Sequence, residues 1–294
     1  MKEFARFHPI VNFTYFMLVI LFSCIFMHPV CLFISLFSSI IHMYLLNGSK
    51  SLKFIFIYLP LLLIAVTVLN PIFNHEGMTI LAYLPDSNPL TLESVIYGFF
   101  SGIMVISVIC HFSCFSNIMT SDKFIYLFGK IIPSLALIFS MVLGFIPKFT
   151  AQIKKVSSAQ KALGGYSSKS VILKCRHALS VLSIMVTWSL ENAIETADSM
   201  KSRGYGLSNR TAFSNFKFDR RDAFFLIFLI VSAIYILLGA VGNALHFAYF
   251  PLIQGSQNTV YQCSIFIFYL LLFFTPILIE GLEGFKWKLL KQKI

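Results

Sequence analysis

Two short segments of the chain end in the same way and carry residues suited to binding another protein. Ala159–Gly164 and, 40 residues later, Ala197–Gly204 each place a lysine three residues before the closing glycine. Glycine directly after a helix is a common stop signal, because it adopts the left-handed conformation without steric cost. Arg203, next to Gly204, could interact with the helix dipole or offer its guanidinium to a carboxylate. The paired ends favour two similar docking sites over a simple helix cap.

Two amphipathic helices are predicted to position these ends. In the first, apolar residues recur at alternating steps of three and four from Leu135 to Leu163. In the second, an apolar stripe runs from Leu182 to Met200, and a polar stripe follows the opposite face at steps of four: Ser183, Thr187, Glu191 and Glu195. We expect each helix to be apolar enough at its start to touch a membrane and polar enough at its end to stand in water.

The composition indicates a chain embedded in a lipid bilayer. Of its 294 residues, 57% are hydrophobic and 12% are charged, and the mean hydropathy is +0.82. A soluble domain averages about 45–50% apolar and about 25% charged residues, so this chain lacks the polar groups to cover a globular surface. A soluble enzyme, a disordered chain and a nucleic-acid-binding protein are thereby excluded. The sequence predicts an all-α polytopic membrane protein.

Apolar runs of about 20 residues predict about six transmembrane helices. Four precede the two amphipathic helices and two follow them, at 11–27, 30–46, 54–69, 92–115, 223–250 and 260–279. A further apolar stretch, Ile131–Ile146, has 16 residues. We expect it to lie along the inner leaflet, because a fifth crossing would place the basic region that follows on the outer side. Five true spans with an outward N-terminus are the alternative.

The basic residues are concentrated in one segment. Residues 148–222 hold 13 of the 23 lysines and arginines but five acidic residues. Basic residues beside membrane helices mark the cytoplasmic face, although the bias weakens for inserts longer than about 60 residues. We therefore expect N-terminal membrane helices in 1–116, a cytoplasmic or interfacial module of two long helices in 117–222, and C-terminal membrane helices with a basic tail in 223–294. Both termini are expected on the cytoplasmic side.

Motifs for catalysis or nucleotide binding are missing from the sequence. It has no His-Glu-x-x-His, no Gly-x-Ser-x-Gly, no Asp-Asp-x-x-Asp and no Walker Gly-x-x-x-x-Gly-Lys-Ser/Thr segment. The six cysteines show no metal-ligand or disulfide spacing. Glu191 and Glu195 could form an intramembrane proton relay, but their position on a polar stripe favours a solvated face. We therefore expect neither a membrane enzyme nor a metal site.

A secondary transporter is also disfavoured. Charged residues at mid-span or paired broken helices are typical of that class, and the predicted spans have no charge at mid-depth. His42, His111 and His246 are scattered in or beside apolar runs. We interpret them as polar membrane residues satisfied by their neighbours.

The two helix ends resemble those of the transmembrane (T) component of energy-coupling factor transporters, the vitamin and metal importers of the ABC superfamily. Ala197-Asp-Ser-Met-Lys-Ser-Arg203-Gly204 is similar to the family's Ala-x-x-x-x-x-Arg-Gly motif. Ala159-Gln-Lys-Ala-Leu-Gly164 is similar to its Ala-Gln-x-Ala-Arg-Gly motif, with Leu163 in the place of the arginine. The preceding Phe145-Ile146-Pro147 also fits the family pattern.

The resemblance implies a scaffold that couples ATP hydrolysis to uptake. Each helix end would dock on one of two cytoplasmic ABC ATPase subunits, with Arg203 paired to a carboxylate there. The implied docking residues are Arg203, Gly204, Ala197 and Lys201 at one end and Ala159, Lys161, Leu163 and Gly164 at the other. At the first end, an apolar contact, Lys161 or Lys169 would replace the missing ion pair.

The same resemblance implies further partners and a location. ATP and magnesium would bind to the ATPase subunits, so this chain would hold no cofactor itself. A small substrate-binding membrane subunit would carry the vitamin, metal ion or similar micronutrient. The assembly would lie in the plasma membrane of a bacterium or archaeon. An ordinary ABC permease, which binds substrate itself, is the alternative.

Overall fold

The computed structural model describes residues 3–83, 89–129, 132–163, 171–205, 216–255 and 259–291. The chain forms two compact units, one made of 1–124 together with 216–294 and the other of 125–215. The N-terminal and C-terminal groups of helices therefore pack into a single unit, and the helices between them form a second.

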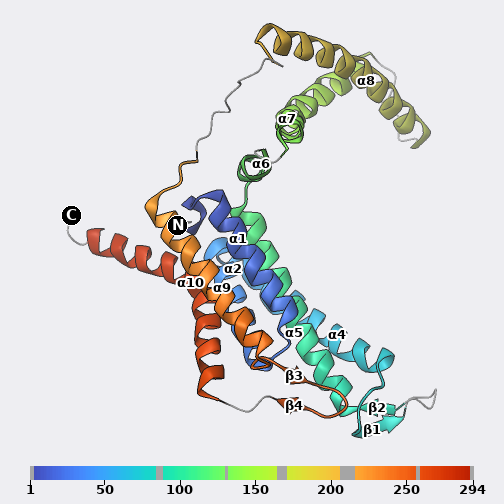
Figure 1. Cartoon of the computed structure of the whole chain (residues 1–294). Coiled ribbons are helices and arrows are strands. Elements are labelled where there is room, and N and C mark those ends of the chain that lie inside the picture. The colour runs from blue at the N-terminus through green and yellow to red at the C-terminus, as the bar shows by residue number, and fades with distance from the viewer. Residues whose placement is uncertain are drawn as a thin grey trace. The chain divides into compact units, whose positions relative to one another are not determined.

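The first unit is a bundle of long helices (Figure 1). These are α1 (Pro9–Ile25), α2 (Pro29–Asn47), α4 (Leu59–Phe73), α5 (Leu92–Ile118), α9 (Arg220–Val241) and α10 (Val260–Lys291). The 3-10 turn η1 (Phe4–Arg6) precedes α1, while α3 (Lys50–Lys53) and the π-helical turn η2 (Phe54–Tyr58) lead into α4. Helix α5 packs against α1, α2 and α4, and α10 packs against α2 and α9.

Two short hairpins join helices of this unit. Strands β1 (Ile80–Tyr83) and β2 (Pro89–Thr91) connect α4 to α5, and pair antiparallel with Tyr83 opposite Pro89. Strands β3 (Phe247–Ala248) and β4 (Gln254–Gly255) connect α9 to α10 and are also antiparallel. Figure 1 shows both hairpins at the same end of the bundle.

Length and composition identify seven described helices that could cross a bilayer. They cover 29–47, 51–73, 92–118, 133–162, 171–202, 220–241 and 260–282. Five coincide with expected spans, whereas α1, also expected to cross, is shorter at 17 residues. The other two, 133–162 and 171–202, belong to the second unit. The all-α, multi-pass architecture is confirmed, and the expectation that 131–146 lies along the inner leaflet stays a prediction.

The core of the bundle is rich in aromatic rings. Phe4, Tyr15 and Phe16 are fully buried, and the Phe4 and Tyr15 rings meet edge to face at 5.1 Å between centroids. The Tyr269 and Phe273 rings stack at 4.3 Å. Lipid tails are as apolar as these side chains, so close packing rather than exclusion from water must hold the helices together.

Two glycines let α5 approach α4 closely. A Cβ atom added at Gly98 would lie 2.9 Å from the Asn70 Cβ and 3.1 Å from the Thr67 carbonyl oxygen. One added at Gly102 would meet Leu63 no closer than 3.5 Å. Small residues four positions apart are typical of close contacts between membrane helices. The α4–α5 contact is therefore tightest at Gly98.

Side-chain hydrogen bonds, one from α10 itself and two from other helices, support α10 where Pro276 interrupts it. Proline has no N–H, so the carbonyl group four residues earlier loses its helical partner. Thr275 Oγ1 donates a hydrogen bond to that carbonyl at 2.8 Å. The hydroxyl groups of Tyr15 in α1 and Ser38 in α2 donate to the next carbonyl, that of Phe273, at 3.0 and 2.7 Å. These bonds tie three helices together at the proline.

Helices α1 and α2 begin with the same His-Pro cap. His8 Nδ1 accepts a hydrogen bond from the N–H of Ile10, and His28 Nδ1 accepts one from the N–H of Val30, both at 3.3 Å. In each helix proline occupies the first position, where no N–H is needed. The caps explain why the helices begin at Pro9 and Pro29, within two residues of the starts of the predicted apolar runs at 11 and 30.

We predict that His28→Ala lowers the free energy of unfolding by about 0.5–2 kcal/mol, because Val30 loses its cap. Burial lowers the pKa of His28 from its ordinary value, so the folded protein favours the neutral ring that can accept this bond. The stabilisation that the His28 cap gives to the folded state is therefore complete above about pH 6.5. It is lost as the pH falls through the lowered pKa of His28 in the folded protein. Thermal unfolding in detergent across this range measures it. His28→Asn retains an acceptor and should reduce the pH dependence; an unchanged pH profile in that variant would contradict the assignment.

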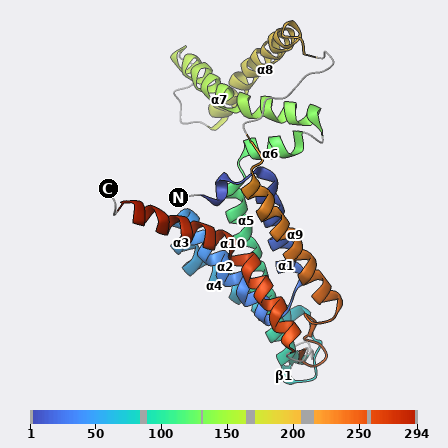
Figure 2. The same ribbon diagram turned by 60° about the vertical axis from the view of Figure 1, so that its left-hand side comes forward.

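The second unit contains α7 (Pro133–Ala162) and α8 (Val171–Ser202), shown in Figure 2. Helix α6 (Ser121–Gly129) runs across the boundary at which the chain passes into this unit. Both long helices were expected from the periodicity, and both end where the glycine signals predict.

Candidate functional site

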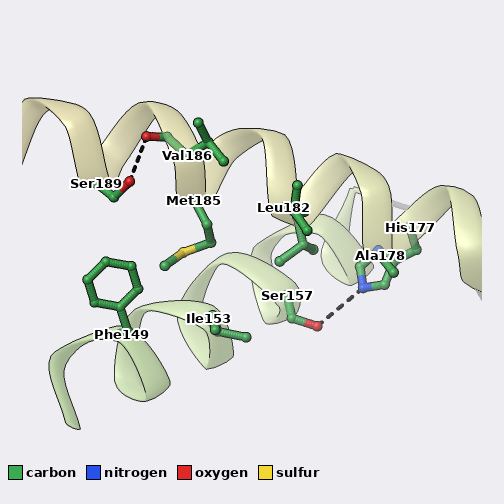
Figure 3. Close-up of a pocket in the computed structure, with 10 residues that line it drawn as sticks. Phe149, Ile153, Ser157, His177, Ala178, Leu182, Met185, Val186 and Ser189 are labelled. Atoms are coloured by element: carbon green, nitrogen blue, oxygen red, sulfur yellow. Dashed lines mark hydrogen bonds between the residues drawn. The ribbon is translucent and has the colours of Figure 1, made fainter. Parts of the chain in front are cut away.

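Helices α7 and α8 pack against each other in opposite directions. Ser157 Oγ lies 3.2 Å from His177 Nε2, and the ring of Phe149 meets Trp188 edge to face at 5.3 Å between centroids. The later contact on α7 thus pairs with the earlier contact on α8 (Figure 3). Because the two helices run antiparallel through this contact, their C-terminal ends point away from each other.

The side of α8 that packs on α7 differs from the expected stripe. Val181 and Met185 are the buried residues of α8. Leu182 and Leu190, members of the expected stripe, are 60% and 63% exposed. Periodicity alone favours the most apolar stripe, but α8 is apolar on more than one side, so contact with α7 selects a neighbouring line of residues. The expected stripe stays largely exposed, and its members Leu182 and Val186 line a groove beside this contact.

A groove of about 510 Å³ follows the line where the two helices meet (Figure 3). Its walls are mainly apolar and include Phe149, Ile153, Val181, Leu182 and Met185. No three His, Cys, Asp or Glu side chains in the described ranges come together in a way that could hold a metal ion. The groove can accept apolar groups.

The C-terminal end of α8 is a Schellman motif. The N–H of Tyr205 donates to the Met200 carbonyl at 3.0 Å, and that of Gly204 donates to the Lys201 carbonyl at 2.9 Å. Gly204 has a φ of +76°, the left-handed conformation that this motif requires at the residue after the cap. Arg203 occupies the cap position itself. The glycine therefore fixes where the helix stops and where the arginine projects.

The side chains at this end are available to a partner. Ala197, Lys201 and Arg203 are exposed, and Gly204 is half-buried. Among the described residues Arg6 forms an ion pair with Glu3, whereas Arg203 forms none. The guanidinium is thus free of the acidic residues that the structure describes, while its backbone is held by the motif.

The end of α7 is similar in backbone but different in chemistry. The N–H of Leu163 donates to the Ala159 carbonyl at 3.1 Å, and the Leu163 side chain is 80% exposed. Ala159 and Lys161 are also exposed. Gly164 lies outside the described residues. This end therefore presents an apolar side chain where the other end presents a guanidinium.

Glu191 and Glu195, considered as a proton relay, are exposed on α8. Their exposure agrees with a solvated face.

Two buried histidines in the bundle differ from the sequence expectation that their neighbours satisfy them. His42 of α2 and His111 of α5 are 1% and 0% exposed, and their ring nitrogens have no hydrogen-bond partner among the described residues. Their rings lie instead against Phe16 and Phe273, at 6.0 and 5.6 Å between centroids. Sequence spacing gave no sign of these aromatic contacts.

Comparison with known proteins places the chain in a family. Residues 3–213, most of the chain, match the family described as CbiQ, cobalt transport protein. The chain belongs to this family. The CbiQ family includes the T components of energy-coupling factor transporters, so the resemblance at the two helix ends is confirmed at the level of the family. The matched range contains the C-terminal ends of both α7 and α8.

Three curated proteins are similar to parts of this CbiQ-family chain. The energy-coupling factor transporter transmembrane protein EcfT of Lactococcus lactis is 29% identical over 106 residues, 35% of this chain and 40% of that protein. EcfT of Lactobacillus helveticus is 28% identical over 102 residues, 34% and 37% of the two chains. An uncharacterized MG181 homolog of Mycoplasma pneumoniae is 26% identical over 162 residues, 51% and 37% of the two chains. The chain spans about two-fifths or less of the length of each of these relatives.

Proposed function

We propose that this chain is the membrane scaffold of an energy-coupling factor importer and that the ends of α7 and α8 dock on two cytoplasmic ATPase subunits. The observation that carries the proposal is the exposed Arg203 at the Schellman end of α8, within a chain of the CbiQ family. A guanidinium forms a bidentate pair with a carboxylate, and such pairs are strong at partly desolvated interfaces. Closure of the ATPases would tilt both helices and move a substrate-binding membrane subunit.

The antiparallel contact between α7 and α8 supports two separate docking sites. Ser157, near the end of α7, lies beside His177, and about 39 Å of helix separates His177 from Arg203 at about 1.5 Å per residue. One end is therefore near the start of α8 and the other is far beyond the contact. Two ATPase subunits could each receive one end without competing for space.

ATP and magnesium would bind to those ATPase subunits, consistent with the missing Walker segment in this sequence. The transported vitamin, metal ion or similar micronutrient would bind to the separate membrane subunit. Both termini of the chain would lie in the cytoplasm of a bacterium or archaeon.

The first docking site should depend on apolar contact. We predict that Leu163→Ala weakens ATPase binding by about 1–3 kcal/mol, because a largely exposed leucine would lose buried area in the complex. Titration of the purified chain with the ATPase subunits measures the loss of binding free energy. Lys161→Ala is the matched control: if it weakens binding more than Leu163→Ala does, a lysine rather than the leucine replaces the family's arginine.

Purification of the full chain from its native membrane distinguishes the proposal from an ordinary ABC permease. We expect two ATPases and a small membrane protein to copurify, and we expect ligand binding to follow that small protein. Tight ligand binding by this chain alone, with no third subunit, would favour the permease.

A further inference from the structure

Strand β1 exposes apolar side chains on both of its faces. All four of its residues are exposed, with Ile80, Leu81 and Tyr83 at 49%, 57% and 68%. Met78, just before the strand, is 66% exposed. In a hairpin surrounded by water, at least one face would be expected to carry polar residues. This apolar strand therefore needs an environment other than bulk water.

The strand is held firmly at the end of the bundle. The N–H of Leu92 donates to the Thr79 carbonyl at 2.9 Å, and Thr91 Oγ1 donates to the Glu76 carbonyl at 2.9 Å. The N–H and the hydroxyl group of Thr79 both donate to the carboxylate of Glu93, in the first turn of α5. These bonds fix the hairpin to α5, so the exposure of β1 is a built feature of the loop.

The length of the adjoining span places the hairpin at the boundary of the bilayer. Residues 51–73 form a helical span of 23 residues, about 35 Å long, against a hydrocarbon core of about 30 Å. Its last turn is apolar and open, with Leu69, Ile72 and Phe73 exposed at 51%, 43% and 81%. The apolar surface of β1 continues from this lipid-facing surface of α4 after a short connection.

Aromatic residues gather at the same end of the bundle. The ring of Tyr97 contacts those of Tyr249 and Phe250 at 5.6 and 5.2 Å between centroids. The Tyr249 hydroxyl donates to the Met27 carbonyl, in the connection between α1 and α2. Tyr249 is buried, with its hydroxyl group bonded inside the protein, so this cluster closes the end of the bundle beside the hairpin.

We propose that β1 inserts into the boundary between headgroups and acyl chains of the adjacent leaflet and anchors the α4–α5 connection there. The partner is the lipid bilayer itself. Residues 71–91 contain no lysine or arginine, so the attraction is apolar and does not require anionic headgroups. The proposal does not depend on the transport function, because it concerns only the packing of the loop against lipid.

Spin-label accessibility of the full chain in vesicles tests this insertion. One label replaces Leu81 in a variant without the exposed cysteines Cys24, Cys175 and Cys263; a second variant carries it at Tyr83. Glu76, exposed in the same loop, is the water reference, and Ile64, 58% exposed on α4, is the lipid reference. Vesicles of pure phosphatidylcholine and of phosphatidylcholine mixed with phosphatidylglycerol separate apolar from anionic attraction.

We expect labels at 81 and 83 to collide with oxygen severalfold more readily than with a nickel chelate, as at Ile64, in both kinds of vesicle. Collision with the chelate as frequent as at Glu76 would show that the strand is in water and would overturn the proposal. Protection from both reagents would show that protein covers the strand and would equally overturn it. Insertion only with phosphatidylglycerol would contradict the apolar mechanism.

Discussion

Arg203→Glu should leave the protein in the membrane and abolish both copurification of the ATPase subunits and uptake of the substrate. The side chain is exposed and makes no ion pair with the residues that the structure describes, so its replacement should not disturb the fold. In the complex, a buried carboxylate that loses its guanidinium costs about 2–5 kcal/mol, and a second carboxylate adds repulsion. Affinity purification and an uptake assay in the same cells measure the two effects.

Arg220→Glu is the matched control for this substitution. Arg220 is exposed at the first position of α9, outside the two helices that carry the docking ends. The control makes the same change in net charge without altering either docking end. Arg203→Lys should cause an intermediate loss, because lysine keeps the charge but lacks the planar fork. Equal losses in Arg203→Glu and Arg220→Glu would attribute the effect to overall charge and refute the docking role.

Gly98→Ala should destabilise the bundle by about 1–3 kcal/mol, the usual cost of overpacking. The new methyl group would lie 2.9 Å from the Asn70 Cβ and 3.1 Å from the Thr67 carbonyl oxygen, and the latter cannot move without shifting α4. The two helices would have to separate, which weakens the close contact that lipid cannot replace. Thermal unfolding of the detergent-solubilised chain measures the change.

Gly102→Ala provides the control one helical turn away. Its methyl group would meet Leu63 at 3.5 Å or more, an ordinary contact distance. Alanine also favours a helix over glycine by about 1 kcal/mol, so this variant should be neutral or slightly more stable. If both alanine variants unfold at the same temperature, the α4–α5 contact is looser than the structure describes.

The helices and their ends could be predicted from local sequence. Runs of apolar residues identify spans because their length matches the bilayer, and Gly204 identifies the end of α8 because only glycine takes a φ of +76° at little cost. The family motif around Arg203 needed no knowledge of the fold. Such features depend on neighbours in sequence, so one chain is enough to recognise them.

The contacts between helices could not be predicted in the same way. Hydropathy favoured the stripe through Leu182, but Val181 and Met185 face α7, because α8 is apolar on adjacent sides and only its partner decides which is buried. His42 lies against Phe16 of α1 and His111 against Phe273 of α10, contacts that the positions of these residues in the chain do not suggest. In a membrane protein, where nearly every side of a helix is apolar, the pattern of hydropathy carries little information about neighbours.

Photo-crosslinking from the end of α8 tests the central claim most directly. A photoreactive residue replaces Ser202, the exposed last residue of that helix, and the protein is illuminated in its native membrane. The same residue at Ser189, which lines the groove between α7 and α8, serves as the reference. We predict that the label at 202 forms an adduct with a subunit that carries a Walker nucleotide-binding segment. Adducts with lipid or with this chain alone, and none with such an ATPase, would contradict the account.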